Sequence, residues 1–125
     1  MGLVQKTAGV IVVKQATAGG YIEAGDGDGV SLAFPGSATR RGRVIHQKSH
    51  TITCACDTCV FYDNVIRRFT VEELEKLQGL PAGYTAAVPE PARKRAIGNG
   101  WTASVITEIF NLLPQAEATA KTDVA

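Results

Sequence analysis

Residues 67–81 have the sequence RRFTVEELEKLQGLP, and this segment contains a strong signal for the start of a helix. Thr70 and Glu73 have the spacing of a capping box, in which each side chain accepts a hydrogen bond from the backbone N–H of the other residue. Phe69 and Leu74 flank that cap, where two apolar side chains pack together as a hydrophobic staple. The pattern predicts a helix that begins directly after Thr70.

The same segment also contains the end of this helix. Gly79 can adopt the left-handed backbone conformation that terminates many helices. Pro81 follows two residues later and prevents the helix from continuing. The predicted helix therefore runs roughly from Val71 to Gln78.

Two further helices are predicted closer to the carboxyl terminus. The first extends from Pro91, which suits a first helical turn, to Ala96 or Ile97, with Gly98 at its end. The second covers residues 102–113 and carries one apolar stripe at helical spacing, made of Val105, Ile106, Ile109, Phe110, Leu112 and Leu113. Such a stripe needs a cover, supplied either by the rest of the chain or by a partner.

The first half of the chain, residues 1–64, is rich in Gly, Val, Thr and Ser and shows no helical period. Its β-branched runs predict strands at 9–14, 43–45, 51–54 and 59–62, the last two forming a hairpin across 55–58. The Gly- and Asp-rich segment 24–29 predicts a loop. Its aspartates suggest a calcium-binding loop, but Ser37 occupies the position of the required glutamate, so we interpret the segment as a solvated turn.

These patterns predict an α/β chain with a small β-rich segment at 1–64, a helical segment of about three helices at 65–113 and a flexible tail at 114–125. The length of 125 residues suits one domain. The net charge of +1 excludes binding to nucleic acid through bulk positive charge and leaves room for a local basic patch. No apolar run could span a membrane and no signal peptide is recognisable, so we expect a cytoplasmic protein whose three cysteines are reduced.

Three segments, in this order and spacing, resemble motifs of the DNA cytosine-5 methyltransferases. Residues 48–53 (KSHTIT) resemble the segment at which the target-recognition region of that family returns to its catalytic domain. Residues 67–85 resemble motif IX, and residues 95–102 (RAIGNGWT) resemble motif X. The resemblance covers residues 40–113, whereas residues 1–39 match only by their position at the end of the target-recognition region.

This resemblance implies a partial, Rossmann-like methyltransferase fold that lacks the core of the cofactor-binding sheet. It implies that Asn99, Gly100 and Trp101 form one wall of an S-adenosylmethionine pocket, beside which the helix at 102–113 packs. It also places a largely basic cluster nearest to the phosphates of DNA, made of Arg40, Arg41, Arg43, Lys48 and Ser49.

The sequence lacks the groups that perform the chemistry of this family. The nucleophile is a cysteine in a Pro-Cys dipeptide, whose thiolate adds to C6 of a flipped cytosine, and no Pro-Cys dipeptide occurs here. The family's Glu-Asn-Val and Gln-x-Arg-x-Arg segments are also absent. We therefore expect no catalytic residue in this chain and S-adenosylmethionine binding only in an enzyme that another chain completes.

Three functional hypotheses follow from the resemblance. The chain is the DNA-recognition subunit of a methyltransferase whose catalytic half is a second polypeptide. Alternatively, it is a stand-alone binding protein of the same ancestry, which binds DNA or acts on a host protein as a phage-type inhibitor or decoy, as a monomer or a homodimer. In the third hypothesis it is an inactive remnant, which predicts poor solubility and a molten character.

The cysteines form a separate pattern, with Cys54, Cys56 and Cys59 spaced as C-x-C-x-x-C and His50 just upstream. Three thiolates and one imidazole are a typical ligand set for structural zinc. The alternative is that the cysteines pack as small apolar side chains, because a second pair of closely spaced ligands is lacking.

Overall fold

The computed structural model describes residues 3–7, 9–15, 18–31 and 43–114. Its strands form two antiparallel sheets. The first sheet has the order β1-β2-β3, with β1 at Leu3–Thr7, β2 at Val10–Lys14 and β3 at Tyr21–Gly25. The second has the order β5-β4-β6-β7, with β4 at Gly29–Ser31, β5 at Arg43–Ile45, β6 at Thr58–Tyr62 and β7 at Val65–Arg68. Three helices follow, α1 at Val71–Leu77, α2 at Glu90–Asn99 and α3 at Ala103–Asn111, which confirms the predicted α/β class.

A single apolar cluster joins the two sheets. It contains Ile11, Val13, Ala24, Val30, Val44 and Phe61, with Ile22 and Ile66 packed against it. Residues of β2 alternate between buried and half-buried positions, as expected for a strand with one face toward a core. Phe61 is fully buried, and burial of such a side chain contributes about 2–3 kcal/mol.

The connection between β3 and β4 is shorter than the predicted loop at 24–29. Strand β3 continues to Gly25 and strand β4 begins at Gly29, so the turn itself spans only residues 26–28. Backbone hydrogen bonds attach it to β6, because Gly27 N donates to Phe61 O at 2.8 Å and Phe61 N donates to Asp28 O at 3.0 Å. The turn is thus part of the sheet framework.

Helix α1 begins as predicted. Thr70 Oγ1 accepts from Glu73 N at 3.2 Å, and Glu73 Oε2 accepts from Thr70 N at 2.8 Å, which confirms the capping box. Arg67 adds two hydrogen bonds of 2.8 Å to the Glu73 carboxylate, and chiefly because of them the pKa of Glu73 falls to about 2. Phe69 packs against the cluster that contains Leu74, as the staple requires.

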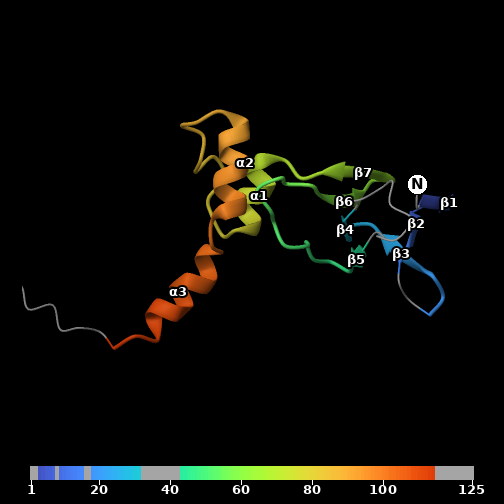
Figure 1. Cartoon of the computed structure of the whole chain (residues 1–125), viewed down its shortest axis with the longest axis horizontal. Helices are drawn as coiled ribbons and strands as arrows, with labels where there is room; N and C mark the ends of the chain where they lie inside the picture. Colours follow the sequence, from blue (N-terminus) through green and yellow to red (C-terminus); the bar gives the residue numbers. More distant parts are fainter. Residues whose placement is uncertain (1–2, 8, 16–17, 32–42, 115–125) are drawn as a thin grey trace, which may run out of the picture.

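The helices have a second, smaller core. Its buried residues are Cys56, Val71, Leu74 and Ile97, with Ile52 and Phe69 packed against them. Helix α1 ends at Leu77, and Gly79 has a φ of +76°, which confirms the predicted left-handed terminator. Helices α1 and α2 therefore enclose a core of their own beside the sheets (Figure 1).

Helix α2 does not end at Gly98 as predicted, but continues to Asn99. A Cβ atom on Gly98 would overlap the backbone of Thr53 and Cys54, so the residue is a contact point between α2 and the segment before β6. Gly98 therefore lets the backbone of α2 approach the segment 53–54 closely, and it does not terminate the helix.

The predicted strand at 51–54 is wrong, and so is the predicted hairpin across 55–58. Residues 51–53 are paired with no strand in the described part of the chain, and Thr53 O accepts from Cys56 N at 3.0 Å in a turn. A strand would need the backbone of this segment for hydrogen bonds to a neighbouring strand, but that backbone packs against Gly98 of α2 instead. Strand β6 forms its hairpin with β7 through Asp63 and Asn64, both with positive φ, as type I′ turns require.

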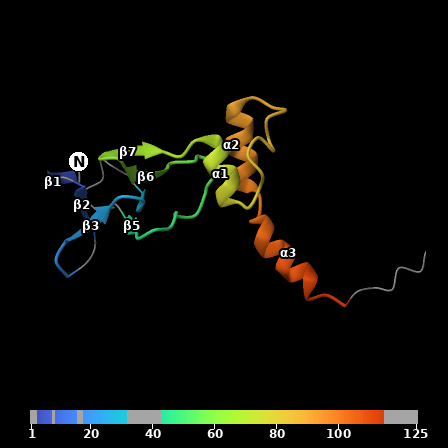
Figure 2. The ribbon, with the colours of Figure 1, turned by 180° about the vertical axis from the view of Figure 1, so that it is seen from behind.

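Helix α3 extends away from both cores (Figures 1 and 2). It begins one residue later and ends two residues earlier than predicted, with Thr102 and Leu112 as its caps. None of its residues is buried. No helix among the described residues has the length and apolar character needed to cross a membrane.

Candidate functional site

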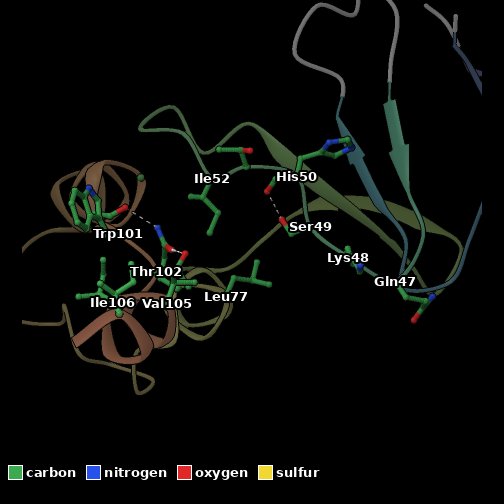
Figure 3. A pocket seen from close by; sticks show the side chains of 15 residues that line it. Gln47, Lys48, Ser49, His50, Ile52, Leu77, Trp101, Thr102, Val105 and Ile106 are labelled. Carbon is green, nitrogen blue, oxygen red and sulfur yellow. Dashed lines mark hydrogen bonds between the residues drawn. The ribbon is translucent and has the colours of Figure 1, made fainter. Parts of the chain in front are cut away.

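An open groove of about 960 Å³ lies between the segment 47–52 and the helices (Figure 3). The helical wall presents Leu77, Trp101, Thr102, Val105, Ile106 and Ile109. The opposite wall is mostly polar and contains Gln47, Lys48, Ser49 and His50. No described residue that lines the groove is acidic, and the lining contains the basic side chain of Lys48. The groove therefore combines an apolar face with a weakly cationic edge.

Asp28 fixes the polar wall. Its buried carboxylate accepts hydrogen bonds from Gly25 N at 2.9 Å, from Gln47 N at 2.9 Å and from His46 Nδ1 at 2.8 Å. Burial alone would raise the pKa of Asp28, but these bonds outweigh it and the pKa lies below its usual value. The predicted solvated turn is thus wrong at Asp28, which anchors the start of the segment 47–52.

Gly29 brings the same wall close to the sheet. A Cβ atom at this position would overlap the carbonyl group of Lys48, so only glycine lets the backbone of Lys48 pass this close to β4. The polar wall is therefore held by the sheet framework rather than by its own side chains.

Gln78 fixes the helical wall, and the sequence contains no pattern that singles it out. Its Nε2 donates to Ile97 O at 2.8 Å and to Gly100 O at 3.2 Å, and its Oε1 accepts from Thr102 Oγ1 at 2.8 Å. Gln78 O also accepts from Ala103 N at 2.8 Å. This one buried amide connects the end of α1 with the junction of α2 and α3.

The apolar side of the groove continues onto an exposed surface. Trp101 is 78% exposed, and the large apolar side chains of α3 and of the two residues that follow it are more than half exposed: Val105, Ile109, Phe110, Leu112 and Leu113. The predicted stripe is present, and among the described residues nothing buries it. Large exposed apolar patches on folded proteins commonly mark contact sites.

The predicted cofactor and DNA residues are only partly brought together. Gly100 and Trp101, assigned to a cofactor wall, line the same groove as Lys48 and Ser49, assigned to DNA contact. Asn99 is exposed at the end of α2 and is not in the groove lining.

Of the remaining residues of the predicted DNA-contacting cluster, the structure describes Arg43, which is not among the residues that line the groove. Arg43 is exposed on β5, where its carbonyl accepts from His50 Nε2 at 3.1 Å. Arg40 and Arg41 lie outside the described residues.

A buried charge holds the loop between α1 and α2, and the sequence pattern missed it. Glu75 has no exposed side-chain surface and accepts from Gly83 N at 2.5 Å, from Thr85 N at 2.8 Å and from Thr85 Oγ1. The Thr85 hydroxyl, with these backbone bonds and Arg93, lowers the pKa of Glu75 to about 2 although burial opposes ionisation. Arg93 Nη2 lies 3.2 Å from Glu75 Oε1 and from Glu72 Oε1, so this guanidinium group is half-buried between the two carboxylates.

The four candidate zinc ligands do not form a metal centre. Cys54 is exposed, whereas Cys56 and Cys59 are buried as free thiols. Cys56 Sγ donates to Thr53 O at 3.3 Å, and burial raises the pKa of both buried thiols, which disfavours the thiolate that zinc binds. Within the described ranges, no three His, Cys, Asp or Glu side chains are grouped so that they could hold a metal ion.

The groove by itself does not fit S-adenosylmethionine. Trp101 offers an aromatic face for a purine, and Gly100 leaves room beside it. A ligand with an ammonium and a sulfonium group calls for carboxylates, yet the described lining contains none and places Lys48 opposite Trp101.

Comparison with known proteins gives one match. No curated protein and no solved structure matches the chain. The family model of the C-5 cytosine-specific DNA methylases matches residues 12–115, which is most of the sequence. The match includes the capped helix α1, the α2–α3 junction and both walls of the groove. The chain therefore belongs to the C-5 cytosine-specific DNA methylase family.

Proposed function

We propose that this chain is the non-catalytic, carboxyl-terminal and DNA-recognition part of a cytosine-5 methyltransferase, and that a second polypeptide supplies the catalytic half. The observation that carries this proposal is the bare apolar face of α3 beside the open groove. A family member whose matched region exposes such a face has a docking surface for the rest of the enzyme.

The lack of a suitable nucleophile also supports a non-catalytic role for this chain. The sequence contains no Pro-Cys dipeptide, and two of its three cysteines are buried thiols whose raised pKa disfavours the reactive thiolate. Cys54 is exposed but lies in a turn against α2, away from the groove lining. The chain thus has no group suited to attack C6 of a cytosine.

In this proposal the groove and its surroundings have two tasks. Lys48 and Ser49, together with Arg40, Arg41 and Arg43, contact DNA phosphates and fix the orientation of the duplex. Gly100 and Trp101, with Asn99 nearby, complete one wall of the S-adenosylmethionine site once the catalytic half is docked. The isolated chain binds no cofactor.

Co-expression with a catalytic half tests this proposal. The probe is the amino-terminal part of a single-chain cytosine-5 methylase, cut before its motif IX, and the readout is methylation of plasmid DNA. Each polypeptide alone should give no methylation, and the pair should give a signal that Leu112→Ser in this chain abolishes. Leu112 is 85% exposed, so its substitution removes an exposed contact and leaves the fold intact.

A stand-alone binding protein is the second candidate. It is favoured by the two separate buried clusters and the internally satisfied Asp28, Glu75 and Gln78, which give the chain a core of its own. Cooperative unfolding of the isolated chain, combined with no methylation in the paired experiment and retained binding to a DNA duplex, would favour this candidate over the split enzyme.

A further inference from the structure

The two halves of α3 have different surroundings. The proximal half contributes Val105, Ile106 and Ile109 to the wall of the groove. The distal end of the helix carries Phe110 and is followed by Leu112 and Leu113, and these three side chains are exposed and absent from the groove lining. One molecule therefore presents both an open apolar groove and an apolar helical end that projects beyond it.

The charges of these two features are complementary. The groove lining that the structure describes contains Lys48 and no acidic side chain. Helix α3 contains Glu108 as its charged residue and has no basic residue in its last turn. Neither Lys48 nor Glu108 forms an ion pair with another described residue. A second α3 placed in the groove brings its own carboxylate to an unpaired ammonium group.

The exposed apolar area is sufficient for pairing of two copies. With an aromatic side chain at about 150–250 Å² and an aliphatic one somewhat smaller, the exposed fractions of Trp101 and of the large apolar side chains at 105–113 add to roughly 700 Å² of apolar surface. A standard interface buries about 800 Å² per partner. Residues 115–125 contain no apolar side chain larger than valine, so their composition offers no substitute cover.

We propose that a second copy of this chain covers the stripe, with the two α3 helices antiparallel across a two-fold axis. The segment 108–113 of each copy then lies in the groove of the other copy, with Glu108 facing Lys48 of that copy. Such an isologous contact closes on itself, because each copy gives one helix and receives one. This dimer does not rest on the proposed function, but it occupies the same face, so a catalytic half must displace the second copy.

Sedimentation equilibrium of the isolated full chain tests the pairing. The expected species has twice the 13.2 kDa mass of one chain, with a Kd on the order of micromolar. Leu112→Ser should weaken the dimer by at least about ten-fold, as loss of a central apolar contact does. Lys76→Glu, at an exposed site outside the groove lining, is the matched charge control and should leave the dimer unchanged.

A charge swap tests the orientation of the helices. Lys48→Glu and Glu108→Lys should each weaken the dimer by about five-fold, because a two-fold dimer then loses both copies of a partly exposed ion pair. A chain that carries both substitutions should regain the original Kd, because the pair is restored with opposite polarity. A monomer at every concentration, a dimer indifferent to Leu112→Ser, or a double variant as weak as the single variants would each overturn the proposal.

Discussion

Substitution of Gly98 by alanine should destabilise this protein, although the same change stabilises an ordinary helix. Alanine gains about 1 kcal/mol over glycine inside a helix. In α2, however, the added Cβ would overlap the backbone of Thr53 and Cys54, which cannot rotate away as a side chain can. Overpacking against rigid groups costs typically 1–3 kcal/mol. With the upper value for this overlap, we expect a net loss of about 2 kcal/mol.

Urea denaturation measures this effect. With a slope of about 1.5 kcal/mol per molar urea, a loss of about 2 kcal/mol lowers the midpoint by about 1.3 M. Ala96→Gly is the matched control in the same helix, because Ala96 is exposed and the change should cost only the propensity difference of about 1 kcal/mol. If Gly98→Ala raised the midpoint, α2 would not contact the segment before β6, and the reasoning about the helical core would be refuted.

Three further outcomes concern stability. Phe61→Ala should cost about 4 kcal/mol, measured by urea denaturation, because Phe61 is fully buried between the two sheets; a cost below about 1 kcal/mol would mean that the sheets do not share a core. Thr70→Ala should cost about 1 kcal/mol through loss of the cap on α1, whereas Thr107→Ala, at an exposed site in α3, should be near neutral in the same assay. The pKa of Glu75 lies at about 2 in the folded chain against an ordinary value of 4.5. Its contribution to stability is therefore complete above about pH 4.5 and is lost as the pH falls toward 2. Glu75→Gln should flatten that part of the dependence of melting temperature on pH, and an unchanged slope would contradict the role of Glu75.

The sequence predicts most accurately those elements whose signals are local. The capping box at Thr70 and Glu73 and the terminator at Gly79 use contacts within a few residues, and each is present as expected. The strand at 43–45 was found from its β-branched residues alone.

The errors arise where long-range contacts decide. The pattern at 51–54 has the composition of a strand, but its backbone packs against Gly98, more than forty residues later in the sequence. Gly98 itself resembles a helix terminator and is a contact point instead. Strand β4 has only three residues and strand β7 contains two arginines, so neither is recognisable as a strand from its own sequence. Both are strands because they form hydrogen bonds with neighbouring strands of the sheet.

In the candidate site, too, the sequence indicates some residues, whereas others are recognisable only from the tertiary structure. The motif resemblance identified Gly100, Trp101, Lys48 and Ser49, and these four residues line one groove. Asp28 and Gln78, which position the two walls, are polar residues whose burial follows only from the tertiary structure. A sequence pattern can indicate side chains that face a ligand, but it does not reveal the hydrogen bonds that position them.

The exposed apolar stripe affects the stability of α3, which can be measured. Helix α3 has nine residues, none of them buried, and isolated helices shorter than about 12–15 residues are marginal in water. Its helical conformation must therefore depend on whatever covers the stripe.

Hydrogen exchange at the amides of residues 106–112 measures this dependence. We expect rapid exchange in the dilute monomer and protection increased at least about ten-fold when a second copy or a catalytic half is bound. The amides of α1 serve as the control, because that helix has a buried core of its own and should be protected at every concentration. Protection of 106–112 that does not change with concentration or with added catalytic half would show that α3 is held within a single chain, and it would contradict both proposals for its partner.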